Sequence, residues 1–95
     1  MRMFIASAEI EILLYESQSL KEKRKVVKSL ISKVRNQFNV AIAEINYLDT
    51  WQRAGLGLVC IANQSSNAIR QLDRVLEYIE SDGRFEIINI YKELS

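Results

Sequence analysis

The spacing of hydrophobic residues along the chain switches between a period of two and a helical period, and each switch predicts a change of secondary structure. Residues 3–14 alternate, which predicts a strand with one buried and one polar face. Residues 38–45 and, more weakly, residues 85–94 alternate in the same way. The run 56–62 is continuously apolar and short enough to be a buried strand.

A helical period follows the first strand. Ser19 and Glu22 form a capping box, so we expect a helix that begins at Leu20 and gives way near Asn36. Its hydrophobic residues fall on one face, and its basic residues fall on another. Lys23 lies within the apolar arc, and we expect its ammonium group to reach water at the mouth of the core.

A second apolar stripe predicts a second helix in the C-terminal half. Residues 63–66 offer N-cap chemistry for its start, and Gly83 is expected to stop it. Residues 47–54 have no period and are expected to form a turn or a hairpin arm, in which Asp49 and Gln52 are suited to cap one helical turn.

This order of elements, βαββαβ, predicts one fold. Right-handed crossovers and a short hairpin give a single α+β ferredoxin-like sandwich over residues 1–95, with a four-stranded antiparallel sheet of order 4-1-3-2 and two helices on one face. The first strand becomes central, and the side with Ala6 and Ala8 takes the helices. The residues left on the open face are Ile5, Ser7, Glu9 and Glu11.

Composition limits the function mainly through missing residue types. The chain has no histidine, which excludes His/Cys zinc sites and Ser-His-Asp or Cys-His catalysis. It also lacks the glycine-rich phosphate loop of acylphosphatases, the paired cysteines of metal chaperones, and the RNP1 and GxxG patterns of RNA-recognition and KH domains. Its one cysteine, Cys60, lies in an apolar run and is expected to be buried. We expect no cofactor and no metal site.

No apolar run approaches the roughly 20 residues that span a bilayer, and the N-terminal residues resemble neither a signal peptide nor a transit peptide. We therefore expect a cytoplasmic protein without a membrane partner.

Charge is distributed unevenly along the chain. Residues 19–37 carry seven cations and one anion, a net of +6, whereas the other residues carry six cations and eleven anions, a net of −5. A solvated basic face is the common alternative, but this concentration indicates an anionic partner, RNA or a ribosomal particle. The expected RNA contacts are Lys21, Arg24, Lys25, Lys28 and Arg35, with Trp51 and Arg53 as secondary contacts through stacking and phosphate binding.

Glu9 and Glu11 lie on one face of one strand, roughly 6 to 7 Å apart along it. This separation is compatible with paired carboxylate chemistry, but solvated or interface-paired carboxylates are the commoner case, and we expect no enzyme. Two carboxylates on the open face would also repel phosphate. The expected RNA contact therefore moves to the outer side of the first helix.

The alternative function is a homodimeric interaction module or a small-ligand sensor. If the alternation holds, Ile5, Val59 and Ile61 form an exposed apolar surface on the open face, and a contiguous exposed apolar surface is typical of an interface. We expect a homodimer under either function.

The chain also resembles a known family, the YlxP-like family of small bacterial proteins of unknown function. The strings that carry the resemblance are Ser-Leu-Lys-Glu-Lys-Arg at 19–24, Phe-Asn-Val at 38–40, Ala-Glu-Ile at 43–45, Asp-Thr-Trp-Gln-Arg-Ala at 49–54 and Leu-Gly at 56–57. The resemblance implies a ferredoxin-like fold. Members are often encoded beside transcription-elongation and translation-initiation factors, which implies a role around RNA or the ribosome.

The chain departs from that signature at three positions. The resemblance leads us to expect an Asp-His-like pair at Asn46 and Tyr47 and an acidic residue at Gly55. An acid/base or metal role for this arm is therefore not expected here.

Overall fold

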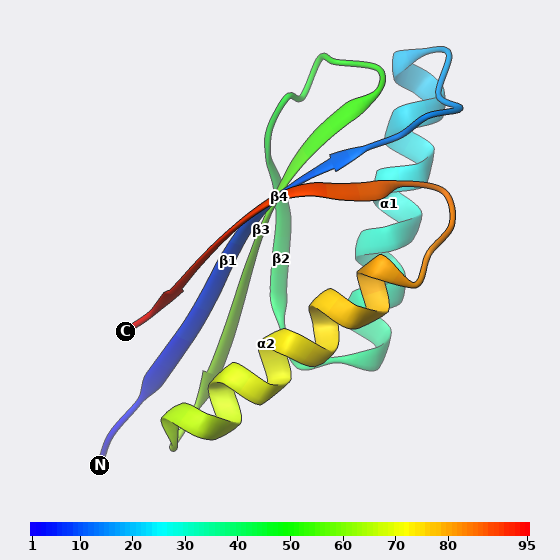
Figure 1. Ribbon diagram of the computed structural model, residues 1–95. Coiled ribbons are helices and arrows are strands. Elements are labelled where there is room, and N and C mark those ends of the chain that lie inside the picture. Colours follow the sequence, from blue (N-terminus) through cyan, green and yellow to red (C-terminus); the bar gives the residue numbers. More distant parts are fainter.

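A computed structural model describes all 95 residues. Its strands form one antiparallel sheet of order β2-β3-β1-β4, and both helices cover the same face (Figure 1). The predicted ferredoxin-like βαββαβ fold and its strand order are confirmed. Neither helix is long and apolar enough to cross a membrane. The elements are β1 (Phe4–Leu13), α1 (Leu20–Gln37), β2 (Ala41–Asn46), β3 (Arg53–Ala62), α2 (Ser65–Glu80) and β4 (Glu86–Leu94).

The alternation of β1 determines which face of the sheet is covered. Ala6 and Ala8 are buried on the covered face, where α2 packs against β1 and β3 while α1 packs against β2. The small alanine side chains let the helix backbone approach the central strand closely. Cys60 is fully buried in the same core, as predicted, and burial raises the pKa of its thiol.

The start of α1 agrees with the prediction, with one difference in its cap. The Ser19 hydroxyl accepts a hydrogen bond from the Glu22 backbone N–H at 3.1 Å. The Glu22 carboxylate accepts from the Gln18 backbone N–H at 2.8 Å, rather than from that of Ser19 as a standard capping box would have it. The helix then runs to Gln37, one residue beyond the expected end.

The predicted limits of α2 are partly wrong. Its N-cap is Gln64, which makes no side-chain cap hydrogen bond, and the helix ends at Glu80 without using Gly83, since no glycine has a positive φ. Asp82 holds the turn instead, because its carboxylate accepts hydrogen bonds from the Arg84 backbone N–H and guanidinium. These bonds lower the pKa of Asp82.

The hairpin between β2 and β3 also differs from the prediction. β2 begins at Ala41 rather than at Phe38, and β3 begins at Arg53 rather than at Leu56. The helical turn suggested by Asp49 and Gln52 does not form. Gln52 instead ties the β2–β3 loop to Ser17, and Asp49 lies within 3.7 Å of Arg24.

Candidate functional site

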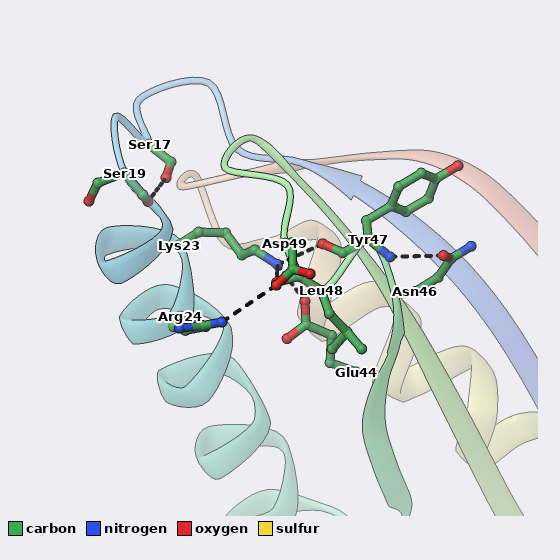
Figure 2. A network of polar contacts seen from close by, with 9 residues as sticks. All are labelled: Ser17, Ser19, Lys23, Arg24, Glu44, Asn46, Tyr47, Leu48 and Asp49. Atoms are coloured by element: carbon green, nitrogen blue, oxygen red, sulfur yellow. Dashed lines mark hydrogen bonds and ion pairs between the residues drawn. The ribbon is translucent and has the colours of Figure 1, made fainter.

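A fully buried lysine joins α1 to β2 and to the loop that follows it. Lys23 is 0% exposed, and its Nζ donates to Glu44 Oε2 at 2.5 Å, to the Tyr47 carbonyl at 3.0 Å and to the Leu48 carbonyl at 3.3 Å (Figure 2). The expectation that this ammonium group reaches water was wrong. The three oxygen acceptors replace water around the charge, which is the condition under which a buried lysine is tolerated.

The loop of residues 47–52 begins at this buried charge. Tyr47 has a φ of 59°, in the left-handed region, and its N–H donates to Asn46 Oδ1 at 2.9 Å. Few non-glycine residues adopt this conformation without support from their surroundings. The Lys23 ammonium group supplies that support, because it holds the carbonyl of the same residue.

The far end of the loop is held as well. The Gln52 side-chain amide donates to the Ser17 carbonyl at 3.1 Å, and the Gln52 carbonyl accepts from the Leu14 N–H at 2.8 Å. Between the two ends, Asp49 lies 3.7 Å from Arg24, and both of these side chains are exposed. The loop is therefore fixed beside the first turns of α1, at the same end of the molecule (Figure 1).

Trp51 lies within this fixed loop and is 55% exposed. A tryptophan folded back against the hydrophobic edge of the fold was the alternative to an RNA contact, and this exposure shows that the indole is not buried in the core. One end of the loop is bonded to Lys23 of α1, and the other end is bonded to Leu14 and Ser17, just before that helix. The backbone of Trp51 therefore lies near the N-terminal end of α1.

The outer side of α1 carries a continuous row of cations, which we call the basic stripe: Lys21, Arg24, Lys25 and Lys28. All four are exposed, and only Arg24 lies within ion-pair distance of an anion. Their spacing of three, four and seven residues places them on one face along about 10 Å of helix. The charge of this face is therefore largely uncompensated.

The structure does not bring Arg35 and Arg53 into this stripe. Arg35 lies near the other end of α1, where its Nη2 donates to the Ile42 carbonyl at 3.0 Å on the sheet edge. Arg53 lies on the open face of the sheet, 3.5 Å from Glu11 and 5.5 Å from the centre of the Tyr47 ring. Each of these two guanidinium groups already has partners within the fold.

The open face is acidic and apolar. Val59 and Ile61 are exposed, as the alternation predicted, whereas Ile5, which was expected to be exposed with them, is half-buried. A hollow of about 640 Å³ lies over the middle of this face, and its lining includes Glu9 and Glu93.

The three departures from the family signature also gather on the open face. Asn46, Tyr47 and Gly55 line one pocket of about 320 Å³ together with Glu9 and Glu11. A Cβ on residue 55 would lie 2.7 Å from the Cβ of Asn46, so this backbone requires glycine there. These positions lie apart from the basic stripe.

The buried pair of Lys23 and Glu44 was missed by sequence reasoning, although a signal was present. Lys23 occupies an inward position of its helix. Glu44 lies two residues after Ile42 on β2, so its side chain is on the same face of the strand as Ile42, which faces the core. Two opposite charges at inward positions of neighbouring elements predict a buried ion pair. Three of the strings that carried the family resemblance, 19–24, 43–45 and 49–54, thus meet at one end of the fold.

These features define a class: a ferredoxin-like α+β protein with an exposed basic stripe beside a fixed, tryptophan-bearing loop. The model of a family described as "Protein of unknown function (DUF503)" matches residues 5–92, and the chain belongs to this family. The chain is 44% identical over 82 residues to the "Uncharacterized protein YlxP" of Bacillus subtilis (strain 168), covering 86% of this chain and 89% of that one. The predicted YlxP-like relationship is confirmed.

Among solved structures, the "De novo designed protein Foldit4" is similar to the chain with a TM-score of 0.53. The similarity covers 99% of this chain and 97% of the designed one, at 12% sequence identity. At this identity the likeness concerns the fold alone. Function has to be argued from the side chains.

Proposed function

We propose that this protein is a non-enzymatic, cytoplasmic RNA-contacting protein that docks on RNA or on a ribonucleoprotein particle such as the ribosome through the basic stripe. The observation that carries the proposal is the row of four exposed cations on α1, of which three have no anionic partner. A stripe about 10 Å long spans about three nucleotide steps of a stacked strand, in which nucleotides recur about every 3.4 Å along the helix axis. Phosphate contacts of this kind provide affinity with little sequence specificity.

Trp51 adds a second mode of contact beside the stripe. Base stacking on an exposed aromatic ring contributes about 1–3 kcal/mol per base in single-stranded complexes. The attachment of the loop at both ends supports this role, because an ordered backbone loses little conformational freedom when a base stacks on its exposed side chain. Trp51 is the one tryptophan of the chain, so its fluorescence reports on the contact.

The open face of the sheet is less suited to RNA than the basic stripe, which supports the proposed RNA contact on α1. Glu9 and Glu93 lie on the open face of the sheet without an ion-pair partner, and their charge repels phosphate. An RNA strand that lay across the sheet would meet these carboxylates. The outer side of α1 therefore suits RNA better than the sheet does.

A pair of matched double variants tests the proposal. Lys21→Glu with Lys25→Glu reverses two charges in the stripe, and Arg70→Glu with Arg74→Glu reverses two exposed charges with the same spacing on α2. Both change the net charge by −4. In fluorescence anisotropy with a labelled single-stranded RNA, we expect the first variant to bind at least ten-fold more weakly and the second to stay within three-fold of the unmodified protein. Equal losses, or no binding by the unmodified protein, would contradict the proposal.

Substitution of the tryptophan tests the stacking contact separately. We expect Trp51→Ala to weaken RNA binding by about 5-fold to 160-fold, which corresponds to about 1–3 kcal/mol, and Trp51→Phe to retain most of the affinity. Quenching of the Trp51 fluorescence on addition of RNA is the direct readout. Unchanged fluorescence at saturating RNA would show that no base stacks there.

A further inference from the structure

The open face of the sheet carries a second feature, which is independent of the basic stripe. In the two rows that cross the hollow, small and large side chains lie at opposite edges of the face. One row runs Ala41, Val59, Ser7 and Glu93 from β2 to β4, and the next runs Ala43, Gly57, Glu9 and Tyr91. Each row thus has an alanine at the β2 edge and a long side chain at the β4 edge.

Charges are divided across the hollow in the same way. Arg35 contributes a cation at the β2 edge, where its guanidinium is held by the Ile42 carbonyl. Glu93 contributes an anion at the β4 edge. Three strand spacings of about 4.8 Å separate the two edges, so these side chains do not neutralise each other within one copy.

We propose that a second copy of this chain covers the open face, related to the first by a two-fold axis that runs parallel to the strands. Such an axis places the β2 edge of one copy over the β4 edge of the other. Tyr91 then lies over Ala43 of the partner copy, and Arg35 lies near Glu93 of the partner copy, twice by symmetry. Large side chains meet small ones, and opposite charges meet.

An apolar row completes this arrangement. Ile5 and Ile61 are paired across β1 and β3, and in the dimer Ile61 lies over Ile5 of the partner copy. Val59 lies over Ser7 of the partner copy in the adjacent row. These three hydrophobic residues leave water together, which supplies the driving force for association.

A two-fold axis across the strands fits the face poorly. It would place β2 over β2, so the alanines of the two copies would face each other and leave a void. It would also place Arg35 against Arg35 and Glu93 against Glu93, which like-charge repulsion disfavours. Because side-chain size and charge differ between the β2 edge and the β4 edge, the two-fold axis parallel to the strands is favoured.

The size of the face sets the expected strength. Four strands of six to ten residues have a footprint of about 400–600 Å² per copy, at about 4.8 Å between strands and about 3.3 Å per residue. This lies at the low end of specific interfaces, and Glu9 adds a carboxylate near the centre. We expect a dissociation constant between about 1 and 100 µM.

Sedimentation equilibrium between 1 and 500 µM tests the proposal, and charge exchange tests the axis. We expect Arg35→Glu and Glu93→Arg each to raise the dissociation constant at least ten-fold, and the double variant to return within three-fold of the original value. A monomer throughout this range would overturn the proposal. Single reversals that strengthen the dimer, or a double variant that stays weak, would overturn the parallel axis.

Matched apolar variants test the face itself. Val59 is 42% exposed on the open face and Ile69 is 41% exposed on α2. We expect Val59→Asp to abolish the dimer at 100 µM and Ile69→Asp to leave it intact, with far-UV circular dichroism confirming that both variants fold. Removal of the central charge in Glu9→Gln should strengthen the dimer. A Val59→Asp protein that folds and still dimerises would overturn the proposal, whatever the RNA experiments show.

Discussion

Replacement of Lys23 by methionine keeps the unbranched apolar stem of the side chain and removes its charge and its three donors. The ammonium group is fully buried and is bonded to Glu44, Tyr47 and Leu48. After the substitution, Glu44 remains as a largely buried carboxylate without its cation. Removal of one partner from a buried ion pair costs about 3–5 kcal/mol.

The residual exposure of Glu44 decides where in that range the cost falls. Its side chain is 15% exposed, so water relieves part of the penalty, and the two loop carbonyls can turn toward solvent. We therefore expect Lys23→Met to lower the free energy of unfolding by about 3 kcal/mol, near the lower end of the range. For a domain of this length, that corresponds to a fall in Tm of about 12–24 °C.

Urea unfolding followed by far-UV circular dichroism measures this loss, and Lys28→Met is the matched control. Lys28 lies on the same helix, is exposed and makes no ion pair, so its substitution should change the free energy of unfolding by less than about 0.5 kcal/mol. In the double variant Lys23→Met with Glu44→Leu, both charges are gone, and the loss should shrink to about 1 kcal/mol. Equal effects of Lys23→Met and Lys28→Met would refute the reasoning, as would a double variant less stable than Lys23→Met alone.

Three further predictions concern the fold. Gly55→Ala should lower the free energy of unfolding in urea by about 1–3 kcal/mol, because the new Cβ would lie 2.7 Å from the Cβ of Asn46. Gly83→Ala is the control: residue 83 has open space around it and no positive φ, so this substitution should be neutral or stabilising by up to about 1 kcal/mol. Cys60 should react with a thiol reagent only at the rate of unfolding, because burial raises the pKa of its thiol and blocks access. Asp82→Asn should remove less than about 1 kcal/mol of the loss in folding stability that occurs at acid pH. The pKa of Asp82 is lowered in the native state, so its carboxylate stabilises the fold above about pH 4 and loses this effect as pH falls through the native pKa. Measurements of the free energy of unfolding from pH 2 to 7 would detect the difference.

The elements that sequence reasoning found are those with local causes. The alternation of β1 depends only on the strand period, and the start of α1 depends on Ser19 and Glu22, three residues apart. The exposure of the basic stripe also follows from the helical period, since the stripe lies opposite the apolar face. These features require no knowledge of what packs against them.

The features that were missed depend on contacts between distant residues. Lys23 is buried because Glu44 and two loop carbonyls, 21 to 25 residues away, surround its ammonium group. Gly83 does not stop α2, because the Asp82 carboxylate organises the turn through its own hydrogen bonds. Arg35 and Arg53, both expected as RNA contacts, are bonded instead to a carbonyl on the sheet edge and to Glu11, which are partners that the local sequence pattern does not reveal.

The salt dependence of RNA binding tests the proposed function most directly. Four phosphate contacts to single-stranded RNA give a slope of about −2.8 in a plot of the logarithm of the association constant against the logarithm of salt concentration. We predict a slope near this value for the unmodified protein and a slope near −0.7 for the variant in which Lys21, Arg24 and Lys28 are all changed to glutamate. Binding that is indifferent to salt, or a triple variant with the affinity and slope of the unmodified protein, would contradict the assignment of the basic stripe as an RNA interface.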